Sequence, residues 1–285
     1  MRRVELAIVG GGPAGLAAAI EAARRGIDAV VLERRAGVVD KACGEGLMPG
    51  AVAALDELGV ELPRARPFLG VAYRDSVDET LLAEGTFSAG PGMGVRRVRL
   101  HEALRKAAYS AGCRIITHRV TSIQQDQGSV WVGPGIQAQW VIAADGLHSR
   151  IRRQMGLEMG ARSRNRFGLR RHFHLAPWSE RVEVHWSHVG EAYVTPVGED
   201  LVGVAFLFTA PGRYEDLLRH FPVLRERLAD AQPATEVRGA GAFARRARRV
   251  HEGRVLLVGD AAGYEDALTG EGIAIAIESA RAAVA

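Results

Sequence analysis

The sequence predicts an α/β fold: a βαβ-type domain built from both ends of the chain, with an inserted antiparallel sheet that forms an α+β insert. The chain opens with a β-rich run, a glycine-rich turn and an alanine-rich helical segment. A buried strand run at 254–258 and a helical segment after it close the printed sequence. Between these ends, residues 165–210 consist of strand-like runs interrupted by Gly and Pro, which is typical of an antiparallel sheet.

The composition is that of a globular protein: 285 residues, 25% charged and 47% hydrophobic. No apolar run reaches the roughly 18 residues of a membrane-spanning helix, so stable membrane insertion is not expected. The first apolar run leads into glycines and not into a cleavage site, which argues against a signal peptide. Two cysteines, Cys43 and Cys113, are too few for a disulfide framework and lack metal-ligand spacing. We expect a cytoplasmic protein.

The net charge is +4, and nearly all the cations are arginines. They gather in two clusters: Arg162, Arg164, Arg166, Arg170 and Arg171, then Arg245, Arg246, Arg248 and Arg249. No nucleic-acid-binding motif accompanies either cluster, so no nucleic-acid partner is expected. We interpret both clusters as solvated, salt-bridged faces.

The elements begin with a compact unit. Residues 4–9 form a strand, 14–25 a helix that Gly26 ends, and 29–32 a second strand that ends at Glu33. This is a βαβ unit of the usual length of about 30 residues.

Further elements follow from periodicity and from turn residues. Helices are expected at 51–58, 99–111, 213–229 and 273–285, and a glycine-rich loop at 41–50. Extended segments are expected at 67–83, 114–118, 129–132, 140–144, 236–244 and 254–258, and in the inserted sheet at 167–175, 182–186, 192–197 and 201–209. The predicted binding domain is discontinuous, with residues 1–66, 94–160 and 245–285, and the inserted domain has residues 67–93 and 161–244.

The turn after the first strand carries the pattern Gly10-x-Gly12-x-x-Gly15, with Pro13 and Ala14 between the last two glycines. Gly10 allows a tight turn, Gly12 lets a pyrophosphate approach the backbone, and Gly15 lets the helix pack closely on the strand. Glu33 lies 18 residues after Gly15, where it would bind a ribose hydroxyl pair and repel a 2′-phosphate. The pattern predicts a dinucleotide site but fits NAD and FAD equally.

Four blocks in order make the chain resemble FAD-dependent oxidoreductases of the aromatic-hydroxylase (p-hydroxybenzoate hydroxylase-like) fold, a family that includes flavin monooxygenases and a geranylgeranyl-reductase-like branch. The blocks are 10–15 with Glu33, 41–46 (Lys-Ala-Cys-Gly-Glu-Gly), 143–152 (Ala-Ala-Asp-Gly-Leu-His-Ser-Arg-Ile-Arg), and 254–262 with 268–273 after it. The resemblance spans essentially the whole chain. It implies a Rossmann-like FAD-binding domain with a substrate-binding antiparallel sheet over the flavin.

The resemblance also implies cofactor contacts near the end of the chain. Asp260 would hydrogen-bond the ribityl chain or ribose of FAD. The backbone amides of Gly272 and Ile273, in the block that also contains Gly270, would face the flavin pyrimidine edge. A helix N-terminus at that edge favours the anionic reduced flavin.

Three more contacts are implied in the middle of the chain. Asp145 would order the pyrophosphate region, although a turn and N-cap role explains it equally well. Arg97 would reach the FAD phosphates as a forked donor, with Arg96 as a competing assignment. Val120 falls where the family makes a backbone contact on the adenine side.

The Cys43-Gly44-Glu45-Gly46 loop is the most distinctive segment, because in the reductase-like branch it passes over the flavin ring. Cys43, Gly44 and Gly46 are therefore cofactor-binding candidates, and Cys43 is also a candidate catalytic thiol. The alternative for Cys43 is a small buried hydrophobe.

Tyr193 is the second catalytic candidate. Reductases of that branch often have Tyr-x-Trp-x-Phe-Pro in the substrate sheet, where this chain has Glu-Ala-Tyr-Val-Thr-Pro at 191–196, with Tyr193 in the tryptophan position. This departure argues against isoprenoid specificity. The halogenase pattern Trp-x-Trp-x-Ile-Pro is absent, which argues against halogenation.

Four histidines, His172, His174, His185 and His188, lie in the predicted sheet. Strand alternation puts His172 and His174 on one face, but no carboxylate or cysteine pattern joins them, so no metal site is predicted. The cofactor is expected to carry the chemistry.

The leading functional hypothesis is an NAD(P)H-dependent monooxygenase that hydroxylates or epoxidises an apolar small molecule through a flavin C4a-hydroperoxide, with NAD(P)H as the transient electron donor. Phe173, Tyr193, Phe206 and Phe208 of the sheet would exclude water. Two alternatives are a flavin-dependent reductase of an isoprenoid or other C=C bond, and a non-catalytic flavin-binding module. Family members usually continue beyond the last helix, so we expect either an open pocket or one closed by a homo-oligomer or a partner subunit.

Overall fold

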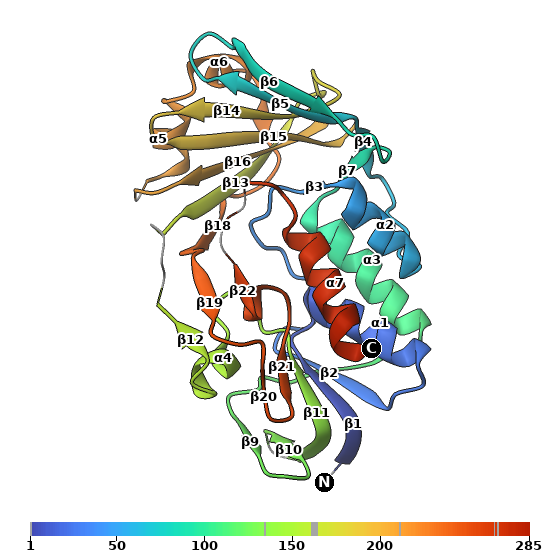
Figure 1. Cartoon of the computed structure of the whole chain (residues 1–285). Helices are drawn as coiled ribbons and strands as arrows, with labels where there is room; N and C mark the ends of the chain where they lie inside the picture. Colours follow the sequence, from blue (N-terminus) through green and yellow to red (C-terminus); the bar gives the residue numbers. More distant parts are fainter. Residues whose placement is uncertain (1, 134, 161–164, 211, 265, 267) are drawn as a thin grey trace.

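The computed structural model describes residues 2–133, 135–160, 165–210, 212–264, 266 and 268–285. The molecule is elongated (Figure 1), with a parallel sheet and its helices at one end and an antiparallel sheet with short helices at the other. Both chain ends lie in the parallel-sheet half.

The parallel sheet has the strand order β20-β21-β11-β1-β2-β8. Its strands are β1 (Arg2–Val9), β2 (Ala29–Glu33), β8 (Arg114–Thr117), β11 (Ile136–Ala143), β20 (His251–Glu252) and β21 (Val255–Leu257). Val9 pairs with Leu32 on one side and Ala143 on the other, so the carboxyl ends of these strands meet at one edge of the sheet. The order β8-β2-β1-β11 is that of a Rossmann-like domain.

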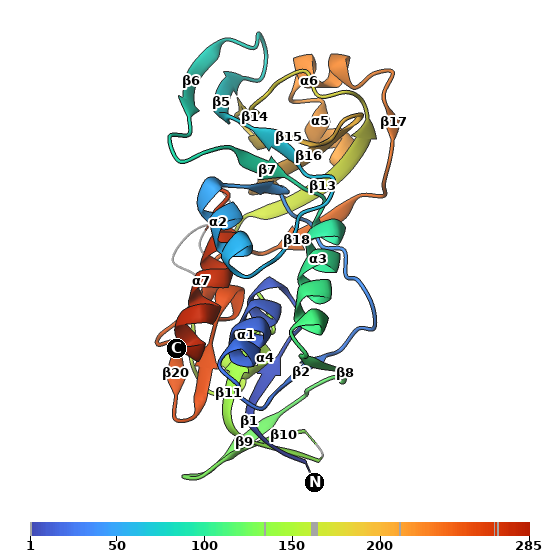
Figure 2. The same cartoon turned by 90° about the vertical axis from the view of Figure 1, so that its right-hand side faces the viewer.

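Helices cover one face of this sheet, as the second view shows (Figure 2). They are α1 (Pro13–Arg24), α2 (Pro49–Glu57), α3 (Arg97–Ser110) and α7 (Gly272–Val284). Alternation along β1 turns Leu6 and Ile8 toward the helices, where the apolar stripe of α1 with Leu16 and Ile20 meets them. Ala7 of β1 belongs to the core on the opposite face.

The opposite face packs against β9 (Ile123–Gln125), β10 (Val130–Val132) and α4 (Arg150–Gln154), with Ile123, Val130 and Ile151 buried there. The predicted opening βαβ unit and the predicted α/β fold with an antiparallel insert are confirmed. The helices expected at 51–58, 99–111 and 273–285 are also confirmed, each with its ends shifted by one or two residues.

The antiparallel sheet has the order β17-β13-β16-β15-β14-β5-β6, with β18 also paired to β13. Its strands are β5 (Gly70–Asp75), β6 (Leu81–Thr86), β13 (Phe167–His174), β14 (Val182–Ser187), β15 (Gly190–Gly198), β16 (Leu201–Phe208), β17 (Gln232–Pro233) and β18 (Arg238–Gly241). The pairing of β14 with β5 is parallel. Phe206, Tyr214 and Phe221 form an aromatic core between this sheet and the helices α5 (Tyr214–Leu218) and α6 (Pro222–Arg227).

The single helix expected at 213–229 is wrong, because two short helices occupy this segment. Phe221, which precedes Pro222, leaves the helical region with φ −128° and ψ 70°. A proline ring disfavours helical backbone in the residue before it, so α5 ends and α6 starts afresh with Pro222 in its first turn.

Small sheets connect the halves. One joins β3 (Gly46–Leu47), β4 (Arg66–Phe68) and β7 (Gly92–Gly94), and another joins β12 (Glu158–Met159), β19 (Arg245–Ala247) and β22 (Gly263–Tyr264). β7 lies so close to β15 that a Cβ on Gly94 would sit 1.7 Å from the Pro196 carbonyl oxygen. The division into two domains stays a prediction. β3 of the proposed binding domain pairs with β7, most of which belongs to the proposed inserted domain.

The interpretation of the first arginine cluster as a solvated face is wrong for Arg170, which is 1% exposed and paired with Asp40. Arg166 pairs with Glu191 and Asp266. Arg162 and Arg164 lie outside the described residues. In the second cluster, Arg246, Arg248 and Arg249 are exposed and Arg245 is half-buried.

Within the part of the chain that the structure describes, no helix combines the length and apolar character needed to cross a bilayer.

Candidate cofactor site and active site

The glycine-rich turn has the geometry that a nucleotide-binding loop requires. Gly10 has φ +109°, and a Cβ there would lie 2.3 Å from the Ala144 carbonyl oxygen. A Cβ on Gly15 would lie 1.8 Å from the Gly10 carbonyl oxygen, so the helix can approach the strand only with glycine there. At Gly12 nothing lies within 4 Å of a Cβ, which leaves its outer side free for a ligand.

Glu33 closes this turn from the end of β2. Its carboxylate accepts the Gly11 N–H at 2.7 Å and the Arg35 N–H at 3.0 Å. Gly12 is the N-cap residue of α1, and no side chain caps that end of the helix. An uncapped helix N-terminus offers N–H donors and the positive end of the helix dipole to an anion.

His101 of α3 supports the turn from the side, and sequence reasoning missed it because no local pattern marks it. Its Nδ1 accepts the Val39 N–H at 2.9 Å, so Nε2 carries the proton and donates it to the Gly11 carbonyl oxygen at 2.7 Å. Burial, together with the charges of Arg97 and Arg105, lowers the pKa of His101 to about 4. The ring is therefore neutral near pH 7.

A group of basic side chains faces the same region. Arg97, buried at the start of α3, has an Nη1 atom without a hydrogen-bond partner among the described residues. Burial is the largest cause that lowers the pKa of Arg97 and that of Lys41, and the Arg97 charge adds to the lowering at Lys41. Burial raises the pKa of Asp260, against the opposing effect of these two cations. Arg96, the competing assignment, likewise has a buried Nε atom without a partner in the described chain.

These observations test whether the residues fit FAD. A buried guanidinium with an unused donor suits a diphosphate, which accepts forked hydrogen bonds, and so does an uncapped helix N-terminus. Glu33 at the end of β2 is placed for a ribose. The residues present therefore fit the cofactor that the sequence suggests.

Asp145 has the alternative role expected from the sequence, which is to hold a turn and the start of a helix. Its Oδ2 accepts the N–H groups of Arg150 at 2.8 Å and Ile151 at 3.3 Å at the start of α4. Its Oδ1 is buried and lacks a partner within the described residues. A ligand role for that oxygen stays a prediction.

Arg152, which sequence reasoning did not single out, holds two of the sequence blocks together. It is fully buried and donates to the carbonyl oxygens of Leu147 at 2.8 Å and Ala261 at 2.8 Å. A further bond reaches the Asp260 carbonyl oxygen at 3.2 Å. Arg152 thus ties the Asp145-Gly146 turn to the short 3-10 helix η1 (Gly259–Ala261).

The other predicted cofactor residues lie at the ends of elements. Gly272 and Ile273 begin α7, whose N-cap Glu271 makes no side-chain capping bond. Gly270 has φ +69° and approaches Met48. Val120 packs against the core on the far face of the parallel sheet, two residues after His118, whose N–H donates to the Glu33 carbonyl oxygen. The contacts of Gly270, Gly272, Ile273 and Val120 with FAD stay a prediction.

Cys43 is half-buried, and its Sγ accepts the Glu45 N–H at 3.4 Å. Burial first, and then the Glu45 carboxylate, raise the pKa of the Cys43 thiol, while Arg97 and Arg170 oppose them. The thiol is therefore protonated at neutral pH.

Tyr193 lies on β15 with its hydroxyl oxygen buried and, within the described chain, unpartnered. Burial raises its pKa, and Arg166 opposes this effect. Tyr264, which sequence reasoning missed, interacts electrostatically with both Tyr193 and Cys43.

The expectation that no carboxylate joins the histidines is wrong. His172 Nε2 lies 2.5 Å from Glu45 Oε2, and His185 Nε2 lies 3.3 Å from Glu183 Oε2. His174 is exposed and His188 stacks edge-on with His220. Sequence reasoning could not find the first pair, because 127 positions separate its members.

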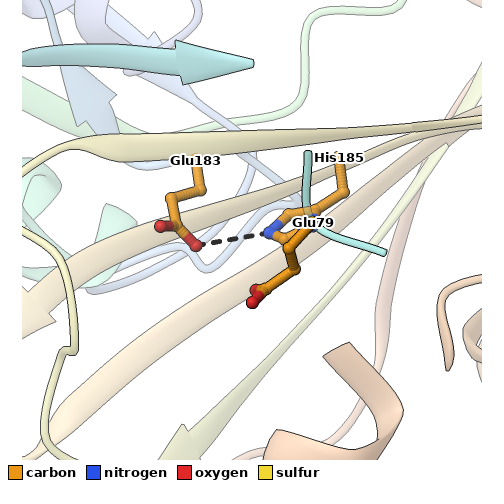
Figure 3. A group of neighbouring side chains, drawn as sticks. All are labelled: Glu79, Glu183 and His185. Atoms are coloured by element: carbon orange, nitrogen blue, oxygen red, sulfur yellow. Dashed lines mark hydrogen bonds and ion pairs between the residues drawn. The ribbon is translucent and has the colours of Figure 1, made fainter. Parts of the chain in front are cut away.

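Glu79, Glu183 and His185 form a group whose ligand-type atoms lie within 4.8 Å of one another (Figure 3). Each carboxylate already has an arginine: Arg227 lies 2.7 Å from Glu79, and Arg74 lies 3.1 Å from Glu183. This ion-pair network accounts for the group without a metal ion.

The FAD binding domain family matches residues 3–205. The chain belongs to this family. The resemblance to FAD-dependent oxidoreductases inferred from the sequence blocks is thereby confirmed, and FAD is the cofactor that the family binds.

Curated relatives match nearly the whole chain. Dialkyldecalin synthase of Streptomyces rugosporus is 29% identical over 96% of this chain and 62% of its own length. Menaquinone reductase of Mycobacterium tuberculosis is 28% identical over 98% of this chain and 75% of its own. Digeranylgeranylglycerophospholipid reductase 2 of Methanosphaera stadtmanae is 29% identical over 98% of this chain and 76% of its own length.

Solved structures share the fold. The flavin-dependent halogenase CmlS superposes with a TM-score of 0.87 at 24% identity, covering 100% of this chain and 58% of its own. The p-nitrophenol 4-monooxygenase PnpA of Pseudomonas putida gives a TM-score of 0.85 at 23% identity, covering 100% and 79%. This chain therefore spans only part of the length of its relatives, about three fifths for dialkyldecalin synthase and for CmlS.

Proposed function

We propose that the protein is an FAD-dependent oxidoreductase that takes electrons from NAD(P)H and reduces a carbon–carbon double bond of an isoprenoid or of another apolar small molecule. The leading hypothesis from the sequence is a monooxygenase, with this reductase second. Relatives named menaquinone reductase and digeranylgeranylglycerophospholipid reductase, each matched over 98% of the chain, support the reverse order.

The residues proposed to hold FAD are those expected from the sequence. They are Gly10, Gly12, Pro13, Ala14, Gly15, Glu33, Cys43, Gly44, Gly46, Arg97, Val120, Asp145, Asp260, Gly270, Gly272 and Ile273. Arg97 would bind the phosphates with its unused donor, and Glu33 would bind the ribose. The uncapped N-terminus of α7 would stabilise negative charge on the reduced ring system.

The observation that carries the proposal is the Cys43 thiol, whose Sγ accepts the Glu45 N–H at 3.4 Å and whose pKa is raised by burial. Reduction of a C=C bond adds a hydride to one carbon and a proton to the other. Reduced FAD, when bound, supplies the hydride, and its two electrons come from NAD(P)H. Cys43 Sγ would hold the proton and release it to the second carbon; Arg97 and Arg170 would stabilise the thiolate until a water proton replaces it.

The test is turnover without oxygen. FAD-loaded protein is mixed anaerobically with NADPH or NADH and a menaquinone or polyprenyl lipid, and the product is analysed by mass for the addition of two hydrogens. We expect reduced product, and we expect Cys43→Ser to lower its rate by about tenfold or more because a hydroxyl is a much weaker acid. Cys113→Ser is the matched control and should leave the rate unchanged. A requirement for oxygen would overturn the proposal.

The monooxygenase remains a second candidate, and the buried unpartnered hydroxyl of Tyr193 favours it. That hydroxyl could orient a polar group at the end of an otherwise apolar substrate held against the sheet. Oxygen uptake equal to product formed, with one oxygen atom in the product, would support this candidate. Binding of FAD without NAD(P)H oxidation in the presence of any substrate would support the non-catalytic module.

Assembly and location are part of the same proposal. We expect a cytoplasmic protein whose substrate side is open or is closed by a second copy or a partner subunit. Light scattering of the FAD-loaded protein distinguishes a monomer from a homo-oligomer.

A further inference from the structure

The Cys43–Gly46 loop is held from the antiparallel sheet, although it belongs to the parallel-sheet half of the chain. Glu45 has φ +64°, a left-handed backbone that residues other than glycine rarely adopt. Its side chain is nevertheless 1% exposed, so the surroundings over-determine this conformation. The partners that do so come from β13, from β15 and from the segment that leads into α3.

His172 of β13 makes the closest of these contacts. It is fully buried, and its Nε2 lies 2.5 Å from Glu45 Oε2. The guanidinium of Arg170 lies 3.2 Å from His172 Nδ1, and arginine can only donate. Nδ1 therefore accepts, which leaves the proton on Nε2 to be donated to the Glu45 carboxylate. Thr235 Oγ1, 3.0 Å from Nδ1, completes the surroundings of the ring.

The other carboxylate oxygen of Glu45 accepts the Arg97 N–H at 2.7 Å, at the start of α3. The Glu45 carbonyl oxygen accepts the Val95 N–H at 2.9 Å. Thr195 of β15 donates from its hydroxyl to the Gly44 carbonyl oxygen at 2.8 Å. The loop is thus bonded on one side to the segment that leads into α3 and on the other side to the sheet.

This network of hydrogen bonds extends to the sulfur of Cys43. The backbone N–H of Glu45 donates to Cys43 Sγ at 3.4 Å, so the position of Glu45 sets the position of the thiol. His172 bonds to Glu45, and Glu45 bonds to Cys43, so His172 acts on the thiol through Glu45. A bond between a buried histidine and a buried carboxylate is among the stronger hydrogen bonds in a protein.

We propose that His172 and Thr195 are positioning residues that fix the Cys43 thiol by holding Glu45 and Gly44. Their value for double-bond reduction rests on the proposed function, whereas the positioning itself can be measured without substrate or turnover. Failure of this inference and failure of the proposed function are therefore distinguishable.

The experiment measures the alkylation rate of Cys43 by iodoacetamide in the full chain, with and without FAD, by mass spectrometry of the peptide that contains it. Cys113, half-buried beside β8, is alkylated in the same sample and serves as an internal reference for general loosening. Circular dichroism and thermal unfolding identify variants that do not fold.

Two variants of His172 separate the roles of its two ring nitrogens: the asparagine amide lies near the position of Nδ1, and the glutamine amide lies near that of Nε2. His172→Asn keeps an acceptor toward Arg170 but cannot reach Glu45, and we expect Cys43 alkylation to rise by about tenfold or more. His172→Gln places its amide near the Nε2 position and should stay within about twofold of the wild type. His174→Asn, on the same strand but exposed, is the matched control and should have no effect.

A folded His172→Asn protein with wild-type Cys43 alkylation would overturn the inference. Equal effects of His172→Asn and His172→Gln, or a parallel rise at Cys113, would also overturn it, because either means a general loss of packing. If His172→Asn does not fold, Thr195→Val carries the test. It removes the bond to Gly44 at nearly constant volume and should raise Cys43 alkylation by about threefold, and no rise would refute the proposal.

Discussion

At the scale of single residues, the candidate site depends on polar atoms that the protein itself leaves unused or uses only in part. Arg97 has a buried nitrogen without a partner in the described chain, and Tyr193 has a buried hydroxyl in the same condition. Unpaired buried polar groups cost free energy, so a bound ligand that pairs them gains affinity. Glu33 differs, because its carboxylate already organises the glycine-rich turn.

Glu33 therefore has two roles that one substitution would remove together. Glu33→Gln loses the charge that attracts the Gly11 N–H and would bind a ribose. We expect the dissociation constant of FAD to rise by about tenfold, measured by flavin fluorescence during titration of the apoprotein. Glu61→Gln, at an exposed carboxylate that pairs with Lys106, is the control. Unchanged affinity in Glu33→Gln would show that Glu33 is purely structural.

At the scale of elements, the contact between β7 and β15 decides how closely the halves approach. Gly94 has no room for a side chain beside the Pro196 carbonyl oxygen. Backbone atoms cannot move aside like the end of a flexible side chain, so a methyl group there must displace a whole strand.

Gly94→Ala should therefore lower the free energy of unfolding by about 2–4 kcal/mol, measured by urea denaturation. Gly85→Ala is the matched control: it also lies in a strand, but nothing is within 4 Å of its Cβ. We expect the control to change the free energy by less than about 0.5 kcal/mol. Equal effects would mean that strand propensity, and not the close approach, dominates at both positions.

Elements with a local signal could be predicted from the sequence. The opening βαβ unit follows from apolar periodicity, from Gly10-x-Gly12-x-x-Gly15, and from Glu33 at a strand end. The helix break at Phe221 has a local signal in Pro222, which the expectation of one helix at 213–229 did not use. The contacts of His172, His101 and Arg152 could not be predicted from the sequence. Each joins two residues that are distant in the chain and meet only in the folded interior, and no local pattern encodes such a contact.

At the scale of the whole molecule, stability depends on buried groups that must stay neutral. The folded-state pKa of His101, about 4, lies below its unfolded value of 6.5. The unfolded chain therefore binds a proton more readily between these values. The stability that neutral His101 provides is complete above pH 6.5 and is lost as the pH falls toward 4.

Lowering the pH from 7 to 5 should cost the protein about 2 kcal/mol of unfolding free energy through His101 alone. His101→Gln can keep a donor toward Gly11 but does not titrate, so its stability should change less over the same interval. Guanidinium denaturation at both pH values measures the difference between the two slopes. Parallel slopes would show that other groups determine the acid sensitivity.

The pairing of β11 with β21, and the position of η1 and α7 beside α1, have a consequence for how the protein is made. The residues proposed to hold FAD include some among the first 33 and some beyond residue 254, and the entire antiparallel sheet is synthesised between these two groups. While the ribosome is still translating that sheet, the opening βαβ unit has neither its last parallel strand nor the Asp260 turn. The edge of β11 that pairs with β21 therefore stays exposed until β21 emerges, and an exposed sheet edge favours aggregation during this interval.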